Sequence, residues 1–347
     1  MAADRRLIKS FIITGQPERA AWQRFVAGHP DGNIFQTPAF DDVAAGTEGW
    51  ASRPLAAVDR ASGELMALWP AVHTTVLGGL LRPLTTRAVL FGGMLVAPEP
   101  AGQDALDALL AVVNRRAWGR SLFTELRHQA DVMAWQPRLE AAHFRWEPHL
   151  NFLIDLRQSE EALWNGLSSS ARRNVRTAQK KGVSALTVSD QAGVETFYGL
   201  LRKVYGHAGV YLTDISLFRR AFEVLGPLGQ FQIVLAMADG VAIGGRASLL
   251  YKGRLLDWYA GADREAARLY PNDFLVWHLL QWGHAQGFSV FDFGGAGHPD
   301  KPYGVRDFKE RFGGQLVNYG RSVKIHAPWY GLAVKAYEIY RKRIIQV

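Results

Sequence analysis

The sequence contains no cysteine and no long uninterrupted run of apolar residues. Without cysteine, disulfides, thiolate metal sites and a cysteine nucleophile are excluded, and a reducing compartment suits the chain. No segment approaches the roughly 20 apolar residues that a membrane-spanning helix needs. The apolar residues near the start are interrupted by Lys9 and are too few for a signal peptide. We therefore expect a soluble, cytoplasmic protein.

Several catalytic patterns are also missing. The ten histidines show no His-Glu-x-x-His or comparable metal-binding spacing, which argues against a metal site. No Gly-x-Ser-x-Gly elbow is present, which argues against a serine hydrolase. His278 and His284 lie on an apolar helical segment, where packing is the simpler role.

The composition is that of a folded protein of two domains. The chain has 347 residues, of which 48% are hydrophobic and 21% charged, and this excludes a largely disordered chain. The net charge of +8 is uneven: residues 1–150 hold 15 basic and 15 acidic residues, and residues 151–347 hold 25 and 17. The second half therefore suits an anionic partner, although surplus charge for solubility is an alternative.

The two halves carry a similar order of elements. Leu55–Ala67 and Ile233–Gly245 each predict a β-hairpin, the second with Asp239-Gly240 as its turn. Each is followed by a helix that runs into a strand, and aligning Gly119 with Gly287 also aligns Phe123 with Phe291. We interpret this as a duplicated mixed α/β unit, with chance similarity of two hairpins as the alternative.

A basic segment in the second half predicts a charged helix. Ser170–Gly182 contains five cations and no acid, and the helix should end at Gly182. Arg172, Arg176 and Lys180 are spaced so that they share one helix face, where like charges repel by a few tenths of a kcal/mol. An anionic partner would relieve this repulsion; a solvated face is the alternative.

The second candidate for chemistry is a glycine-rich strand end. Val290-Phe-Asp-Phe-Gly-Gly-Ala-Gly297 predicts a buried strand that runs into glycines, which allow close approach to a ligand. It is neither a phosphate-binding P-loop nor a dinucleotide fingerprint. Farther on, Phe308 and Phe312 would anchor a short helix and leave Lys309 beside the glycines. A lysine there could stabilise an oxyanion, or be an ordinary surface lysine.

Five motifs in the second half occur in the order seen in a known family. They are Ala171-Arg-Arg-Asn-Val-Arg-Thr-Ala-Gln-Lys-Lys-Gly-Val183, Ala260-Gly-Ala-Asp263, Pro271-Asn-Asp-Phe-Leu275, Phe291-Asp-Phe-Gly-Gly295 and Phe308-Lys-Glu-Arg-Phe-Gly-Gly314. The chain thereby resembles FemAB-type proteins, the peptidoglycan-bridge aminoacyltransferases of the GNAT acyltransferase superfamily. The resemblance covers most of residues 150–320; in the first half Ile34-Phe-Gln-Thr-Pro-Ala-Phe40 is the clearest match.

The resemblance implies an α/β fold with mixed sheets, built as two tandem GNAT-like acyltransferase domains. We expect the first domain over residues 1–150 and the second over 151–327. A terminal helix over about 328–347, with Trp329 and a basic cluster, would pack back on the first domain or contact anionic lipid.

The resemblance also implies transfer of an aminoacyl group from aminoacyl-tRNA to an amine of a cell-wall precursor, with no metal or cofactor. Lys309 would stabilise the tetrahedral transition state, and Asp292 is the nearest sequence candidate for a base, although its place in Phe-Asp-Phe favours a structural role. Five residues in or beside the motifs would contact substrate: Tyr259, Asn272, Tyr303, Arg306 and Phe308. Four cations would bind tRNA or another anion: Arg172, Arg173, Arg176 and Lys180.

Two alternative functions stay open. An N-acyltransferase of the same fold would take an acyl-CoA or acyl-carrier donor in envelope or exopolysaccharide biosynthesis, but Ala262–Pro271 contains no glycine-rich pyrophosphate loop. A non-catalytic module would bind RNA or anionic lipid, but Lys309 and the Phe-Asp-Phe-Gly-Gly turn argue against a degenerate site. For the aminoacyltransferase we expect transient contact with the inner face of the membrane.

Overall fold

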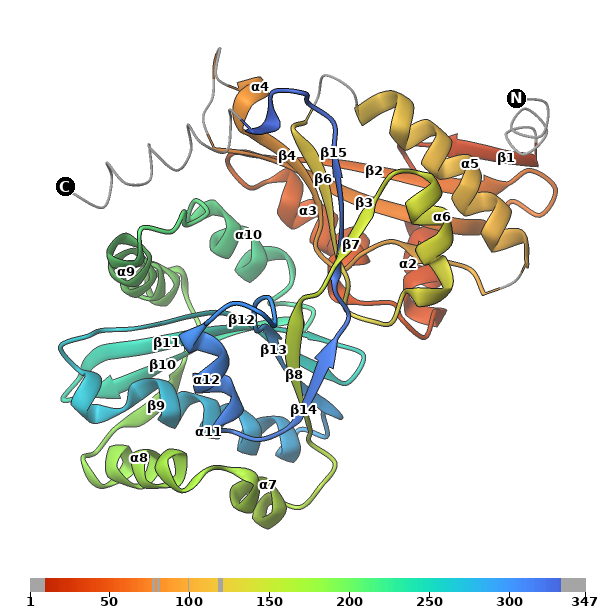
Figure 1. Cartoon of the computed structure of the whole chain (residues 1–347). Coiled ribbons are helices and arrows are strands. Elements are labelled where there is room, and N and C mark those ends of the chain that lie inside the picture. Colours follow the sequence, from red (N-terminus) through yellow and green to blue (C-terminus); the bar gives the residue numbers. More distant parts are fainter. Residues whose placement is uncertain (1–9, 77–78, 80–81, 99, 118–120, 332–347) are drawn as a thin grey trace. The chain divides into compact units, whose positions relative to one another are not determined.

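The fold consists of two compact units, each built around its own mixed β-sheet (Figure 1). The structure is a computed structural model that describes residues 10–331 except 77–78, 80–81, 99 and 118–120. Within these residues, the first unit runs to Pro148 and resumes at Tyr319, and the second unit is His149–Asn318.

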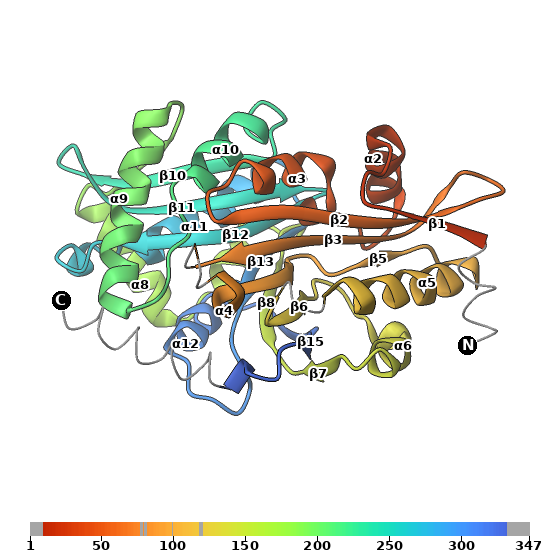
Figure 2. The same cartoon turned by 90° about the horizontal axis from the view of Figure 1, so that it is seen from above.

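The first unit contains an eight-stranded sheet with the order β1-β2-β3-β4-β6-β15-β7, and β5 pairs with β3. Its strands are β1 (Phe11–Thr14), β2 (Trp50–Asp59), β3 (Leu65–Thr75), β4 (Thr86–Leu90), β5 (Leu95–Val96), β6 (Phe123–Arg127), β7 (Arg145–Glu147) and β15 (Arg321–Ile325). Among the described strands of this sheet, β4 and β6 form the one parallel pair. Buried residues of α5 form a core with one face of the sheet, and Figure 2 shows α3 on the other face.

The helices of the first unit are short apart from α5. They are α2 (Arg19–Gly28), η1 (Ile34–Gln36), α3 (Pro38–Ala45), α4 (Arg82–Thr85), α5 (Pro100–Ala117), η3 (Met133–Trp135) and α6 (Gln136–Ala141). The motif over residues 34–40 fixes the turn between η1 and α3: Gln36 donates to the carbonyl of Gly92, and Thr37 caps α3 by accepting from the amide of Phe40. In the first unit, residues 34–40 therefore stabilise the turn and the start of α3.

The second unit contains a seven-stranded sheet with the order β14-β8-β13-β12-β11-β10-β9. Its strands are β8 (Leu150–Asp155), β9 (Ser184–Thr187), β10 (Phe231–Ala238), β11 (Val241–Tyr251), β12 (Arg254–Ala262), β13 (Val290–Gly295) and β14 (Gln315–Asn318). Asp239 and Gly240 both have positive φ in the β10–β11 turn, as the hairpin prediction requires.

Helices cover both faces of this second sheet (Figure 1). They are α7 (Glu160–Gly166), α8 (Ser169–Lys180), α9 (Gln191–Ala208), α10 (Ser216–Val224), η4 (Ala267–Leu269), α11 (Pro271–Ala285) and α12 (Gly304–Glu310). Apolar residues of α7, α8 and α11 form one continuous core with the strands, and α9 and α10 pack on the opposite face. Ser159 caps α7 as predicted, by accepting from the amide of Ala162.

The repeated order of elements that the sequence predicts is present in both units. A hairpin (β2–β3 or β10–β11) leads to a strand (β4 or β12), then a helix (α5 or α11), and then a strand (β6 or β13) that pairs in parallel with β4 or β12. The first unit has the short strand β5 in addition, between β4 and α5. In each unit the parallel pair is three residue pairs long. The two units therefore share one topology around a short parallel pair.

The structure divides the chain differently from the prediction at its end. Strand β15 pairs with β6 and β7 of the first sheet, so residues 319–327 lie with the first unit and outside the second. Of the terminal helix predicted over 328–347, residues 332–347 lie outside the described residues. Before that point, the ring of Tyr330 packs edge-on against Phe123, with centroids 5.6 Å apart.

Candidate active site

The two parallel strands of the second unit separate at their carboxyl ends. β12 and β13 pair only from Arg254 with Val290 to Leu256 with Asp292, although both strands continue beyond these residues. On β12, Trp258 is an extra residue relative to β11, and on β13 the register to β8 shifts between Asp292 and Gly295. Bulges of this kind redirect strands and often lie beside active sites. We call this divergence the strand split.

Lys309 closes the β13 side of the strand split. Its Nζ donates to the carbonyl oxygens of Phe293, at 2.5 Å, and of Gly295, at 2.9 Å, with Gly294 at 3.4 Å. Gly294 has a φ of 67°, so the chain turns sharply here and these carbonyls leave the sheet ladder. The ammonium thus donates hydrogen bonds to backbone carbonyl oxygens that the bulge would otherwise leave buried without a donor.

Burial changes the acid–base properties of this lysine. Lys309 is only 8% exposed, and burial lowers the pKa of its ammonium to about 8, with Arg246 acting in the same direction. The carboxylates of Asp257 and Asp292 partly offset this effect. The alternative that Lys309 is an ordinary surface lysine is therefore wrong. A buried ammonium titrating near neutral pH at a strand split is typical of a functional site.

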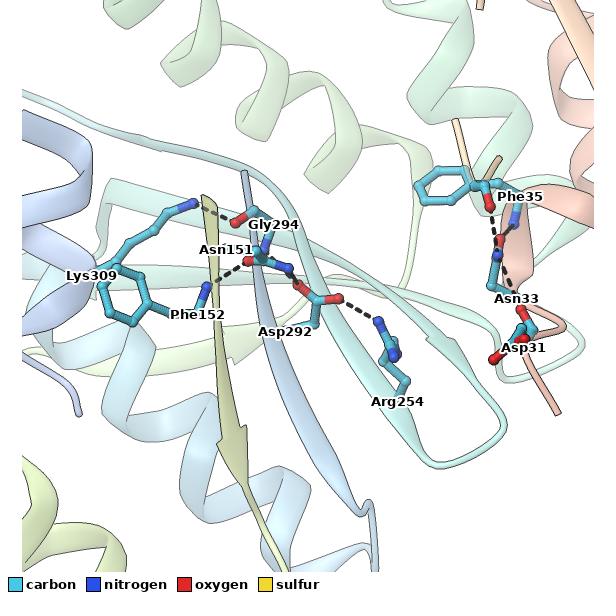
Figure 3. A network of polar contacts seen from close by, with 10 residues as sticks. Asp31, Asn33, Phe35, Asn151, Phe152, Arg254, Asp292, Gly294 and Lys309 are labelled. Atoms are coloured by element: carbon cyan, nitrogen blue, oxygen red, sulfur yellow. Dashed lines mark hydrogen bonds and ion pairs between the residues drawn. The ribbon is translucent and has the colours of Figure 1, made fainter. Parts of the chain in front are cut away.

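Asp292 lies at the centre of a fully occupied polar network (Figure 3). Its Oδ1 accepts from Asn151 Nδ2 at 2.7 Å and from the amide of Gly294 at 2.8 Å, and its Oδ2 accepts from Arg254 Nη1 at 2.8 Å. The side chain is completely buried. This geometry fits a carboxylate that shapes the glycine turn, because both oxygens already have donors.

Tyrosines lie around the far side of the strand split. The rings of Tyr259 on β12 and Tyr205 on α9 have centroids 6.3 Å apart, and Tyr303 lies against Gly297, where a Cβ would come within 2.9 Å of its ring. Burial, with Tyr259, Tyr303 and Asp257 nearby, raises the pKa of Tyr205 above its usual range. Its phenol therefore stays protonated and is a hydrogen-bond donor throughout the physiological range.

Arg306 is used within the protein. Its guanidinium donates to the carbonyl oxygens of Ala296 (2.9 Å), Pro299 (3.1 Å), His298 and Lys301 (3.1 Å). These bonds hold the loop that follows β13 against α12. The structure therefore places Arg306 as the support of this loop, where the sequence suggested a substrate contact.

The two remaining predicted substrate residues lie on two different helices, Phe308 on α12 and Asn272 on α11. Phe308 is partly buried, with Phe312 at 5.2 Å and the guanidinium of Arg311 at 5.0 Å from its ring. Asn272 is half-buried at the second residue of α11. Among the described residues, the side chain of Asn272 forms no hydrogen bond with Lys309 or with the carbonyls that Lys309 contacts, and the ring of Phe308 has no group that could form one.

Sequence reasoning missed a buried ion pair at the strand split. Arg246 on β11 and Asp257 on β12 pair through Nη1 and Oδ2, and their side chains are 3% and 5% exposed. Asp257 is the first residue of β12 beyond the stretch paired with β13. A signal was available, because charged residues inside otherwise apolar strands are seldom buried unless they are paired.

The basic helix α8 divides its cations between two tasks. Arg172 Nη1 donates to the carbonyls of Asn165 (3.0 Å) and Leu167 (2.7 Å) and so caps the end of α7. Arg173, Arg176 and Lys180 are exposed, and no acidic side chain of the described residues forms an ion pair with them. The exposed basic face therefore consists of these three residues and excludes Arg172.

In the part of the chain that the structure describes, no three histidine, aspartate or glutamate side chains lie close enough together to hold a metal ion.

Residues 169–310 match the family model described as an acetyltransferase (GNAT) domain. The match begins at the first residue of α8 and ends at the last residue of α12, so it contains the strand split and Lys309. The second unit is a GNAT-type acyltransferase domain. The protein is accordingly an acyltransferase.

Two relatives and one solved structure are similar to this acyltransferase over much of its length. A lipid II:glycine glycyltransferase of Staphylococcus saprophyticus is 21% identical and aligns with 85% of this chain and 88% of its own. One of Staphylococcus aureus is 25% identical over 65% of this chain, which spans about half (54%) of that relative. The crystal structure of FemX has a TM-score of 0.70 at 18% identity, covering 92% of this chain and 99% of FemX.

These similarities confirm the resemblance to FemAB-type proteins and the tandem GNAT-like fold that the motifs predicted. The non-catalytic alternative is thereby set aside, because residues 169–310, which contain Lys309 and the strand split, match an acetyltransferase domain. Within the described residues, no helix has both the length and the apolar character to cross a membrane.

Proposed function

We propose that this acyltransferase moves an aminoacyl group from aminoacyl-tRNA to an amine of a lipid-linked cell-wall precursor. The observation that carries the proposal is the position of the buried Lys309 at the strand split, within the acetyltransferase-type domain. The relatives to which the chain is similar are lipid II:glycine glycyltransferases. The reaction forms an amide: the amine nitrogen bonds to the ester carbonyl carbon, the ester C–O bond breaks, and the ribose oxygen leaves with a proton.

Lys309 supplies the electrostatics of this step. As the amine attacks, negative charge develops on the ester carbonyl oxygen, and a water-shielded ammonium stabilises such charge far more than it would in bulk water. The bonds of this ammonium to the carbonyls of Phe293 and Gly295 fix the position of Nζ at the strand split, and its third N–H, which makes only a long contact of 3.4 Å with the carbonyl of Gly294, is the one that would turn to the oxyanion. The tyrosines on the opposite side, Tyr205, Tyr259 and Tyr303, would line the path of the substrates.

The start of α11 favours aminoacyl-tRNA over acyl-CoA. Acyl-CoA enzymes of this superfamily bind a pyrophosphate on a glycine-rich loop at a helix start, where free amides and the helix dipole attract anions. Here Tyr270 and Pro271 open the helix, no glycine lies between Ala262 and Pro271, and the carboxylate of Asp273 sits in the first turn. Asp273 is in turn paired with Arg311 at 3.0 Å. A pyrophosphate at this position would find no glycine loop, and it would have to compete with Asp273 for Arg311.

The exposed basic face of α8 supports a large polyanionic donor. Arg173, Arg176 and Lys180 present three cations with no acidic partner among the described residues. A phosphate backbone is attracted by such a face, and its condensed counterions are released on binding. Because the acceptor carries a lipid, we place the reaction at a membrane surface, with contact that is transient.

The test uses the purified protein, radiolabelled glycyl-tRNA and lipid II. An aminoacyl ester is cleaved by mild alkali whereas an amide survives it, so alkali-stable label in the lipid fraction measures transfer. We expect transfer that depends on both substrates and is lost in Lys309→Met. A parallel reaction with tRNA charged with the other amino acids identifies the preferred donor.

The matched control replaces aminoacyl-tRNA by acetyl-CoA with the same acceptor. Acyl transfer from acetyl-CoA, together with no transfer from any aminoacyl-tRNA, would overturn the proposal in favour of a CoA-dependent N-acyltransferase. If the aminoacyl group is transferred from aminoacyl-tRNA to another envelope amine and not to lipid II, the proposed donor stands and the proposed acceptor is corrected.

A further inference from the structure

Asp257 has one carboxylate oxygen that is buried and has no hydrogen-bond donor among the described residues. The residue is 8% exposed, its Oδ2 is bound to Arg246, and its Oδ1 has no partner. A buried acceptor left without a donor costs roughly 1–3 kcal/mol, and more when it is charged. Nearly all such groups in folded proteins have partners, so this one needs an explanation.

The surroundings of Asp257 are incompletely paired as a group. Ser248, the register partner of Asp257 on β11, is fully buried and its Oγ has no partner in the described structure, and neither has Nε of Arg246. Three unsatisfied polar atoms thus lie on two adjacent strands, at the residue where β12 leaves β13. In the same unit, the buried Asp292 has donors on both oxygens. Other buried polar atoms of the second unit also have no partner, on Gln191, Arg220, Gln230 and Gln232, but among the described residues Asp257 is the one carboxylate with such an oxygen.

The charges around Oδ1 of Asp257 determine which kind of hydrogen-bond donor can bind to it. A carboxylate oxygen only accepts, so the partner is a hydrogen-bond donor such as an N–H group. Arg246 is paired with Asp257, and the charge of Asp257 also acts on Lys309, so two cations stand near this carboxylate. Two cations disfavour a third full positive charge, and a neutral amine is favoured over an ammonium ion. Only the neutral amine is nucleophilic.

We infer that Oδ1 of Asp257 receives the N–H of the acceptor amine and holds its nitrogen toward the donor carbonyl. This inference rests on the proposed amide-forming function. In the step, nitrogen bonds to the carbonyl carbon and becomes positively charged while the carbonyl oxygen becomes negative. Asp257 stabilises the nitrogen charge and Lys309 the oxygen charge. The ester C–O bond then breaks, and the ribose oxygen leaves with the proton that the nitrogen gives up.

Asp257 is therefore a catalytic residue that acts on the amine, whereas Lys309 acts on the ester. This division predicts different effects on two reactions of one donor. Transfer to an amine needs both residues. Hydrolysis of the aminoacyl ester by water involves no amine and should depend on Lys309 far more than on Asp257.

The test compares wild type with Asp257→Asn, using glycyl-tRNA and lipid II as probes. Single-turnover transfer should fall roughly 10²-fold, the loss typical of one removed transition-state contact, while glycyl-tRNA hydrolysis changes less than threefold. The matched control is Glu125→Gln on β6 of the first unit, another buried carboxylate paired with arginines, which should lower Tm without changing the ratio of transfer to hydrolysis.

Each outcome is decisive. Equal transfer by wild type and a folded Asp257→Asn would show that Oδ1 holds only a structural water, and would overturn the inference while leaving the function standing. No transfer by the wild type would overturn the function itself. If Asp257→Asn does not fold, Asp257→Glu keeps the charge but moves the free oxygen. A loss of at least tenfold in transfer with intact hydrolysis then supports the inference, and unchanged transfer overturns it.

Discussion

The ammonium of Lys309 lies 2.9 Å from the carbonyl oxygen of Gly295 and is held by backbone on the same strand that carries Asp292. A lysine 16 residues away along the chain from Phe293 thus completes the hydrogen bonding of a bulged strand end. This arrangement links stability and catalysis, because the group that stabilises the bulge is also the one expected to face the developing oxyanion.

Replacing Lys309 with Met should impair both properties. Met preserves most of the side-chain volume but leaves the carbonyls of Phe293 and Gly295 without a donor, so we expect a loss of about 1–3 kcal/mol in the free energy of unfolding. Single-turnover transfer should fall a further 10²–10³-fold, roughly the value of one preorganised oxyanion contact. Substrate affinity should change much less. Urea unfolding and single-turnover assays separate the two effects; full activity in a folded Lys309→Met would remove Lys309 from the mechanism.

The pKa of Lys309 predicts the pH dependence of transfer. Because burial lowers this pKa to about 8, the ammonium is lost as the pH rises through 8, and the rate should fall there. Lys309→Arg should have a lower rate, since the wider guanidinium places its donors differently, but no fall near pH 8. A fall near pH 8 that persists in Lys309→Arg would assign that titration to another group.

The free energy of unfolding should also change in this pH range, but it should rise with pH whereas the rate of transfer falls. The ordinary pKa of lysine is 10.5, so between about pH 8 and 10.5 the unfolded chain binds more protons at this position than the folded chain. The free energy of unfolding should therefore rise with pH across this window by this contribution, and the rise should be absent in Lys309→Met. Urea unfolding at pH 7.5 and 10 measures the difference between the two proteins.

Local features of the fold were predictable because their causes are local. The hairpin at Asp239-Gly240 and the end of α8 at Gly182 follow from residues that adopt positive φ readily. Strand β15 was not predictable, because Arg321–Ile325 pairs with β6, some 200 residues earlier, and no short-range signal specifies that pairing.

The candidate site shows the same limit in its side chains. The motifs identified Lys309 and Asp292. For Arg172 and Arg306, however, the sequence shows only a positive charge. In the fold, both guanidinium groups donate their hydrogen bonds to backbone carbonyls. Asp257 was missed because its role depends on where β12 leaves β13.

The exposed basic face of α8 predicts a salt-dependent contact with RNA. Changing Arg173, Arg176 and Lys180 together to Gln should weaken tRNA binding and reduce the slope of log affinity against log salt by roughly 2, for three lost phosphate contacts. Filter binding across a salt series measures this slope.

The control for that face is a pair of cations on α10. Arg219 is exposed and Arg220 is half-buried, and they are paired with Glu195 and Glu223. Their change to Gln should leave the salt slope nearly unchanged. An equal effect per removed charge in both sets would point to net charge alone, and an unchanged slope in the α8 variant would restore a merely solvated face.

Replacing Arg306 distinguishes between two roles of this residue, support of the loop and direct contact with substrate. Its guanidinium donates to four carbonyls between Ala296 and Lys301, a pattern that neither Gln nor Lys can reproduce. In Arg306→Gln we expect faster amide hydrogen exchange over residues 296–303, even without substrate, because the loop loses its internal support. KM should rise, since Tyr303 then loses its fixed place beside Gly297. If exchange in this loop is unchanged without substrate while KM still rises, Arg306 acts on the substrate directly, as the sequence first suggested.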